Sequence, residues 1–173
     1  MKDSTRNIAL IGFMGAGKTS VGRVLAHLAD MDFVDADNEI EKNVEMPVSR
    51  IFELHGEGHF RCLEYGFYRK ISSLYNTVIA TGGGAVLDER TRAILRENAL
   101  VAYLATSPET IFTRIDDDSR PLLSGNSKMG EIAALMSKRD MLYRQTCHVA
   151  VNTDNLTIAA CAQKVLSLTK KLG

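Results

Sequence analysis

The sequence predicts an α/β fold, a three-layer α/β/α sandwich built on a five-stranded parallel sheet. Short β-branched runs alternate along the chain with longer stretches of helical apolar spacing, and this order is typical of parallel βαβ units. The runs TVIAT and LVAYL are continuously apolar, as expected of strands buried on both faces. The predicted strands are Ile8–Ile11, Asp32–Asp35, Thr77–Thr81, Leu100–Leu104 and His148–Val151.

Helix signals fall between these strands. Apolar residues with helical spacing follow the first strand, and a helix is expected over Asn38–Val44 after the second. Three helix starts carry capping residues. They are Asp88, Ser107 followed by Pro108, and Asn155 before LTIAACAQKVLSL.

Length and composition predict a single domain, residues 1–173. At 45% hydrophobic residues, with 21 basic and 21 acidic side chains, the chain has no basic excess that would indicate nucleic acid. It has no apolar run that would span a membrane, and residues 1–7 are too short and polar for a signal peptide. We therefore expect a cytoplasmic protein, a monomer with small-molecule partners, whose scattered cysteines 62, 147 and 161 are reduced thiols.

The stretch IALIGFMGAGKTSVG, residues 8–22, carries the strongest chemical signal. It contains Gly12-x-x-x-x-Gly17-Lys18-Thr19 between a strand and an amphipathic helix, which is a P-loop. Glycines there let backbone N–H groups surround phosphate oxygens at a helix N-terminus. Lys18 would reach the β- and γ-phosphates, and Thr19 would ligate Mg²⁺. The residues expected to bind ATP here are Gly12, Gly15, Ala16, Gly17, Lys18, Thr19 and Ser20.

A P-loop alone does not fix the reaction. The sequence contains neither the Asn-Lys-x-Asp run nor the Asp-x-x-Gly switch of a GTPase. A kinase for a small acceptor should instead carry a second polar pocket at the ends of the strands.

Two carboxylates in FVDADNEIE, Asp35 and Asp37, fit such a pocket. They stand two apart at a strand end and so can project to the same side. One could hold Mg²⁺ through water while the other accepts the proton of a substrate hydroxyl. The alternative is that Asp37 only caps the helix that starts at Asn38.

Glycines and arginines complete the candidate pocket. Thr81 is followed by Gly82, Gly83 and Gly84, which suit a ligand close to the backbone, although a plain turn is the alternative. Arg61, Arg120 and Arg139 could each bind a carboxylate or phosphate bidentately, or lie on the surface. His55 and His59 have zinc-ligand spacing, but Gly56 and Gly58 interrupt their helix and no third ligand is evident, so we expect no metal there.

Taken together, the motifs resemble those of shikimate kinases. GFMGAGKTSVGRVLA, FVDADNEIE, IFELHGEGHFRCLE, TGGGAV, RPLL and R-x-x-LY occur in that family's order over residues 8 to about 153. The resemblance implies a P-loop fold like that of nucleoside monophosphate kinases, and transfer of the γ-phosphate of ATP to the 3-hydroxyl of shikimate.

The resemblance also implies roles for single residues. Asp37 would hold the reacting hydroxyl, and Asp35 would support Mg²⁺ beside Thr19. Arg61 and Arg139 would bind the carboxylate of shikimate, in an acceptor-binding region of about residues 35–64. Gly82, Gly83 and Gly84 would line the same pocket, with Gly83 and Gly84 closest to the ring.

On the nucleotide side, the resemblance implies a mobile lid over about residues 116–128, in which Arg120 would move over the phosphates. Arg114 would lie against adenine, with residues 151–154, including Asn152, completing that pocket. Met141 and Asn152 depart from the residues that the family often has at these positions.

Two other functions remain open at this point. One is a kinase of the same architecture for gluconate or a nucleoside monophosphate, which would lack the pairing of Asp37 with Arg61. The other is a regulatory ATP-binding module with no acceptor.

Overall fold

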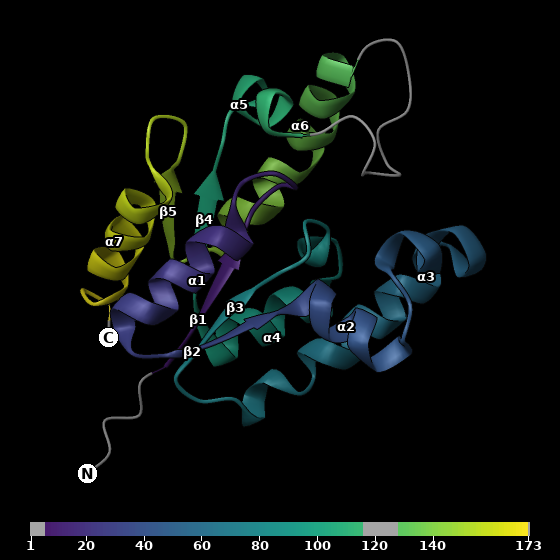
Figure 1. The fold of residues 1–173 in the computed structure, drawn as a ribbon, viewed down its shortest axis with the longest axis horizontal. Coiled ribbons are helices and arrows are strands. Elements are labelled where there is room, and N and C mark those ends of the chain that lie inside the picture. The colour runs from purple at the N-terminus through teal and green to yellow at the C-terminus, as the bar shows by residue number, and fades with distance from the viewer. Residues whose placement is uncertain (1–5, 116–127, 173) are drawn as a thin grey trace.

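The computed structural model describes residues 6–115 and 128–172, which form a parallel sheet between two layers of helices (Figure 1). The strand order is β2-β3-β1-β4-β5, with every neighbouring pair parallel. The predicted α/β sandwich is confirmed. The strands are β1 (Asn7–Ile11), β2 (Asp32–Asp35), β3 (Thr77–Ala80), β4 (Ala99–Ala105) and β5 (Val149–Asn152). The helices are α1 (Lys18–Ala29), α2 (Ala36–Val44), α3 (Val48–Tyr68), α4 (Glu89–Asn98), α5 (Pro108–Arg114), α6 (Lys128–Thr146) and α7 (Ile158–Thr169), with short 3₁₀ turns at Ile71–Ser73 and Ala85–Leu87.

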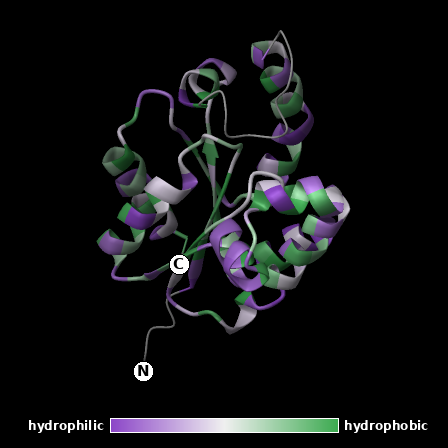
Figure 2. Ribbon diagram, turned by 45° about the vertical axis from the view of Figure 1, so that its right-hand side comes forward, coloured by the Kyte–Doolittle hydropathy of each residue, from purple (hydrophilic) through white to green (hydrophobic). Residues whose placement is uncertain are grey.

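Side chains of alternate strand residues pack into two hydrophobic cores, one on each face of the sheet. Leu10 of β1 packs in the core that includes Leu25 of α1 and residues of α7. Its neighbour Ile11 packs in the core on the opposite face, with Leu95 of α4 and residues of α3 and α6. Both faces are apolar because both are covered, and Figure 2 shows the hydrophobic strands in the middle of the molecule.

Side-chain caps define several helix starts, and they correct two predictions. The predicted starts at Asp88 and Ser107 are confirmed, because each side chain accepts a hydrogen bond from a backbone N–H of its first turn. The predicted start at Asn155 is wrong: α7 begins at Ile158, where the Thr157 side chain caps the N–H of Ala160. The helix expected from Asn38 begins earlier, at Ala36.

The cap of α2 also decides the role left open for Asp37. The Asp35 carboxylate, not Asp37, accepts the hydrogen bond from Asn38 N–H at 3.2 Å. Asp37 lies inside the first turn, so the capping alternative for Asp37 is wrong. Its carboxylate is left for another purpose.

Helix α3 bends at Gly56, the one residue within it with non-helical backbone angles (φ 77°, ψ 170°). The predicted interruption is therefore right at Gly56 and wrong at Gly58. On either side of the bend, α3 packs on α2 through a small apolar cluster that contains Ile40, Ile51 and Phe60. This pairing holds α2 and α3 together beside the sheet.

The carboxyl ends of β1, β2 and β3 lie at one edge of the sheet, and each leads into a motif singled out in the sequence. They lead into the P-loop, Asp35 and Gly82 respectively. In open α/β sheets ligands bind at this edge. No helix of the described residues has the length and apolar composition to cross a bilayer, and the three cysteines are free, as predicted.

Candidate active site

The P-loop adopts a conformation that requires its glycines. Gly12, Gly15 and Gly17 all have positive φ, at 152°, 77° and 91°. A Cβ at Gly12 would also lie 2.8 Å from the carbonyl oxygen of Leu104. The loop ends at Lys18, where α1 begins, so the positive end of the helix dipole faces the loop.

Beside the loop lies a polar cavity of about 340 Å³, lined among others by Lys18, Thr19 and Asp35. The Lys18 ammonium group donates to the carbonyl oxygens of Gly12 and Phe13, at 2.8 and 2.9 Å. The Thr19 hydroxyl donates to Asp35 Oδ2 at 2.6 Å. The structure therefore brings the predicted metal-binding pair together, next to the predicted phosphate-binding lysine.

Two carboxylate oxygens meet above Gly82 without any hydrogen-bond partner. They are Asp37 Oδ1 and Glu64 Oε1, both buried. A Cβ at Gly82 would lie 2.8 Å from the first oxygen and 2.7 Å from the second. Buried polar atoms in proteins are nearly always paired, so this pair of acceptors indicates a place where a donor from outside the chain binds.

Burial dominates the electrostatics of both carboxylates. It raises the pKa of Asp37, with a further rise from Asp35, while the charge of Lys18 opposes the shift. Burial likewise raises the pKa of Glu64, and the Arg61 guanidinium opposes that rise. A carboxylate of raised pKa is a stronger base than one in water, which suits acceptance of a hydroxyl proton.

Arg61 is held by two acidic residues on its own helix. Its Nη1 donates to Glu64 Oε2 at 2.6 Å and its Nη2 to Glu57 Oε1 at 3.0 Å, and its side chain is only 18% exposed. Its guanidinium lies so close to Gly84 that a Cβ at that position would collide with it. The glycine thus allows the guanidinium to approach the loop backbone.

Arg139 reaches the same loop, residues 82–84 after β3 (the glycine loop), from α6. It is 5% exposed, and its Nη1 lies 3.4 Å from the carbonyl oxygen of Gly83. Its guanidinium carbon stands 5.7 Å from the centre of the Phe13 ring, and it forms no ion pair with any described residue. A buried cation without an acidic partner is a strong candidate for binding an anion.

A second cavity of about 110 Å³ joins these groups. Residues from α2, α3, α6, the P-loop and the glycine loop line it, including Asp37, Arg61, Glu64, Gly84 and Arg139. Met14, Asp37 and Gly83 line both this cavity and the polar cavity beside the P-loop, which we call the phosphate cavity because the predicted phosphate-binding residues line it. The two cavities are therefore adjacent, with Asp37 at their junction.

Of the residues predicted to contact the nucleotide outside the P-loop, the structure describes Arg114 and Asn152 but not Arg120. Arg114, at the end of α5, is exposed and places Nη2 3.5 Å from the carbonyl oxygen of Thr153. Asn152 is exposed nearby, and its side-chain oxygen accepts from Asp154 N–H. The structure thus brings both residues to one loop region. Arg120 and the predicted lid, apart from its last residue, lie outside the described residues.

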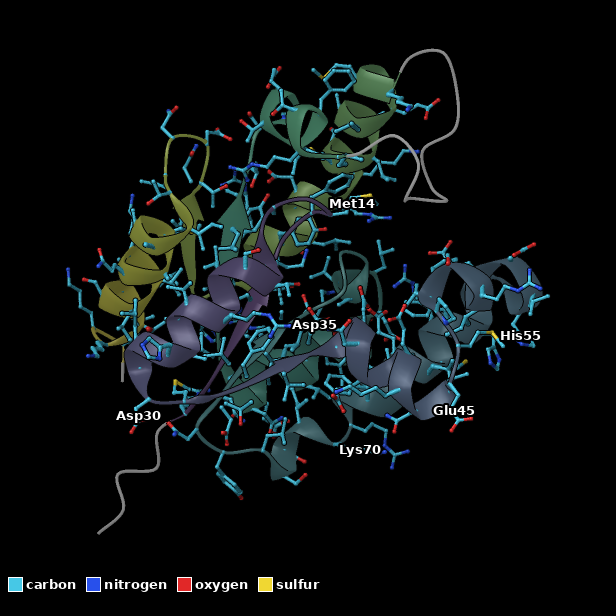
Figure 3. The ribbon with its side chains drawn as sticks, in the orientation of Figure 1. Met14, Asp30, Asp35, Glu45, His55 and Lys70 are labelled. Atoms are coloured by element: carbon cyan, nitrogen blue, oxygen red, sulfur yellow. The ribbon has the colours of Figure 1, made fainter. Side chains whose placement is uncertain are left out.

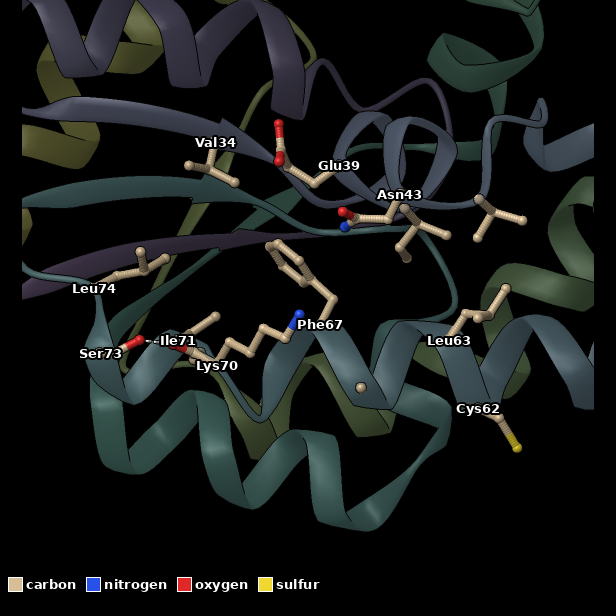
Figure 4. Close-up of a pocket in the computed structure, with 13 residues that line it drawn as sticks. Val34, Glu39, Asn43, Cys62, Leu63, Phe67, Lys70, Ile71, Ser73 and Leu74 are labelled. Carbon is tan, nitrogen blue, oxygen red and sulfur yellow. Dashed lines mark hydrogen bonds between the residues drawn. The ribbon is translucent and has the colours of Figure 1, made fainter.

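A wider cleft of about 680 Å³ lies between β2, α2 and α3, away from the P-loop (Figure 4). Its floor is apolar, with Val34 and Phe67 inside it, while the thiol of Cys62 points outward from α3. Glu39, Cys62 and Lys70 line it, but none of its described lining residues has a buried, unpaired side-chain oxygen like that of Asp37, so its size does not make it the reaction site. His55 lies within α3, one residue before the bend at Gly56 (Figure 3). The described residues contain no cluster that could hold a metal through three or more His, Cys, Asp or Glu side chains.

Comparison with known proteins identifies the family. The family model described as shikimate kinase matches residues 14–170. The chain belongs to the shikimate kinase family. The family predicted from the motifs is confirmed, and with it an ATP-dependent kinase activity on a hydroxyl of shikimate.

Similar proteins span the whole chain. A shikimate kinase of Caldicellulosiruptor saccharolyticus is 43% identical over 94% of this chain and 95% of its own length. One of Neisseria meningitidis serogroup C is 40% identical over 100% and 99%. The solved structure of shikimate kinase from Acinetobacter baumannii in complex with shikimate is 37% identical, with a TM-score of 0.94 over 98% of this chain and 96% of that one.

In this shikimate kinase family member, three residues of the site had no role predicted from the sequence: Glu64, Tyr68 and Tyr143. Glu64 fits the pattern of a surface partner for Arg61, yet it is 2% exposed and faces Asp37. Tyr68 and Tyr143 both contact the glycine loop through their hydroxyls. For Tyr143 the sequence does hold a signal, because this tyrosine ends the R-x-x-LY motif that begins at Arg139.

Proposed function

We propose that the chain transfers the γ-phosphate of ATP to the 3-hydroxyl of shikimate, and that Asp37 holds the reacting hydroxyl. The position of Asp37 carries this proposal. Its carboxylate lies at the junction of the phosphate cavity and the cavity that contains Arg61 and Arg139, with Oδ1 buried and unpaired. A hydroxyl bound there would supply the missing donor and would face the phosphates.

The second cavity fits the chemistry of shikimate, which has a carboxylate at one end and vicinal hydroxyls at the other. Arg139 has no ionic partner among the described residues, and Arg61 faces the glycine loop. Guanidinium groups bind carboxylates through paired charge-assisted hydrogen bonds. In this orientation the hydroxyls reach Asp37 and Glu64, whose free oxygens need donors.

The residues beside the P-loop fit Mg²⁺. The Thr19 hydroxyl and the Asp35 carboxylate are in contact and offer oxygen ligands only, as Mg²⁺ prefers. Few protein ligands are expected, because Mg²⁺ bound to a nucleotide takes most of its ligands from phosphates and water. When bound there, the ion would neutralise charge on the phosphate oxygens.

The chain's own groups then act as follows. Asp37 orients the hydroxyl and accepts its proton as the oxygen attacks phosphorus, while ADP leaves. Lys18 stabilises the negative charge on the phosphates. We propose that Arg120 adds to this charge stabilisation from the lid, that Arg114 and Asn152 contact the adenine side, and that the protein works as a cytoplasmic monomer.

The test is ADP release in a coupled assay with ATP and Mg²⁺. We expect release to depend on shikimate and to be absent with gluconate or with a nucleoside monophosphate. Slow hydrolysis that shikimate does not change would contradict the proposal and favour a regulatory ATP-binding module. Turnover with another acceptor only would favour a different kinase of the same architecture.

A further inference from the structure

Two tyrosines, one on α3 and one on α6, hydrogen-bond to peptide groups of the glycine loop. The N–H of Gly82 donates to the hydroxyl of Tyr68, on α3, at 3.4 Å. The hydroxyl of Tyr143, on α6, donates to the carbonyl oxygen of Gly83 at 2.5 Å. Tyr143 makes the much shorter contact, so it has the larger influence on the orientation of the loop.

The direction of the Gly83 carbonyl also sets the direction of the next N–H. The described residues contain no cis peptide, and in a trans peptide the C=O of one residue and the N–H of the next point to opposite sides. With its oxygen turned to Tyr143, the Gly83–Gly84 peptide turns the N–H of Gly84 away from that hydroxyl. This N–H donates no hydrogen bond within the described part of the chain.

The Gly84 N–H belongs to a residue that lines a cavity with two arginines. Gly84 lines the cavity of Arg61 and Arg139, and the Arg61 guanidinium lies against its Cα. A free N–H on a residue that lines a cavity with two guanidinium groups is suited to bind the same anion as they do.

Tyr143 has a second effect on Arg139, one helical turn before it in α6. Both side chains reach the Gly83 carbonyl, Tyr143 at 2.5 Å and Arg139 at 3.4 Å. Because the hydroxyl satisfies the carbonyl, the guanidinium does not have to move closer to it. Tyr143 also hydrogen-bonds the Arg139 side chain directly, so it holds that guanidinium in place beside the cavity.

We propose that Tyr143 is a positioning residue for the acceptor: its hydroxyl holds the Gly83–Gly84 peptide so that the Gly84 N–H, together with Arg139, binds the carboxylate of shikimate. The residue suits a permanent donor. It is 2% exposed, its ring stacks on Tyr103 at 5.0 Å, and burial raises its pKa to about 12, so it stays protonated at neutral pH. The proposal rests on the proposed function, since it takes shikimate as the acceptor.

Tyr143→Phe tests it, because phenylalanine keeps the stacked ring and loses only the hydroxyl. The Gly83 carbonyl would lose its donor, and we expect KM for shikimate to rise about tenfold, as for loss of one buried hydrogen bond. KM for ATP should change less than about twofold and kcat little, because the contact acts on binding alone.

Tyr103→Phe is the matched control. It removes the hydroxyl of the other ring in the stack, which bonds Asp140 Oδ1 at 3.0 Å and does not touch the glycine loop. We expect no change in either KM. An equal rise in KM for shikimate in both variants, or an unchanged KM in Tyr143→Phe, would overturn the proposal.

A measurement on the unmodified protein makes the test independent of any variant. In ¹⁵N-labelled protein, shikimate should shift the Gly84 amide resonance and slow its exchange with water. If the Gly84 amide does not respond while shikimate still supports ADP release, the positioning proposal fails and the proposed function stands. Absence of shikimate-dependent ADP release would instead refute the proposed function itself.

Discussion

Replacing Asp37 with asparagine should abolish most activity and at the same time stabilise the fold. The carboxylate is buried with Oδ1 unpaired beside Glu64 Oε1, and burial raises its pKa. The native residue therefore costs stability in its charged form. Asparagine removes that charge, and its amide N–H can donate to Glu64.

The magnitudes follow from these contacts. Loss of a base that activates a hydroxyl lowers kcat by about 10²- to 10⁴-fold. Relief of one unpaired buried polar group is worth about 1 kcal/mol, and for a domain of this length that raises Tm by about 2–4 °C. Asp32→Asn is the matched control, since it removes an exposed carboxylate from β2, the strand just before α2, and should change neither quantity.

The stabilisation should depend on pH with a defined sign. Because the pKa of Asp37 is raised in the folded protein, the folded state holds more protons than the unfolded state just above the ordinary pKa, and wild-type stability falls as pH rises through that window. The asparagine side chain in the variant does not titrate. The gain in Tm should thus be present at pH 7 and vanish below about pH 4, where Asp37 is protonated in both states.

Thermal melts from pH 4 to 8, together with steady-state ADP release, measure both effects. A variant that keeps wild-type kcat would show that Asp37 does not act on the hydroxyl. A lower Tm at pH 7 would show that attraction to Lys18 and Arg61 outweighs the cost of burial. A gain that persists unchanged at pH 4 would show that the stabilisation does not come from removing the charge of Asp37.

The other predictions concern the remaining charges and the glycine loop. Lys18→Ala should lower kcat about 100-fold and weaken ATP binding, because it removes stabilisation of the phosphates; equilibrium titration with ATP separates the two effects. Arg61→Lys keeps the charge but loses the paired geometry, so KM for shikimate should rise about tenfold while KM for ATP stays constant; equal rises would contradict this role. Gly84→Ala should weaken shikimate binding on the order of tenfold or more, because the new Cβ collides with the Arg61 guanidinium and displaces it. Calorimetric titration checks this: affinity for shikimate should fall while affinity for ATP stays unchanged.

The three-layer α/β/α architecture and the five-stranded parallel sheet could be predicted, because short stretches of sequence determine which segments form strands and helices. Strands buried on both faces need continuous apolar runs, and the P-loop glycines need positive φ. Which of two nearby carboxylates caps α2 could not be predicted, since Asp35 and Asp37 both suit a helix start. The choice depends on where β2 ends, and that is set by pairing with β3.

Glu64 shows a second limit of sequence reasoning. A glutamate three residues after an arginine on a helix usually indicates an exposed ion pair. Here the pair is mostly buried because α3 lies against the glycine loop, a contact between segments far apart in sequence. Similarly, the apolar residues of α6 do not gather on one face, so their pattern does not predict that the side of α6 that carries both Arg139 and Tyr143 is the buried one.

The glycine loop also explains how two substrates can react across a boundary between two cavities. A Cβ at Gly83 would lie 3.1 Å from the backbone nitrogen of Met14 in the P-loop, so the two loops meet backbone to backbone. Phosphoryl transfer requires the attacking oxygen about 3–3.5 Å from phosphorus, and a side chain between the loops would move the acceptor away from the phosphates. The glycines after β3 therefore do more than make a turn: one lets the P-loop approach, and the next lets Arg61 approach. Together they place Arg61, the arginine proposed to bind the acceptor, and the P-loop, proposed to bind phosphate, on either side of a single short segment, with Asp37 facing both.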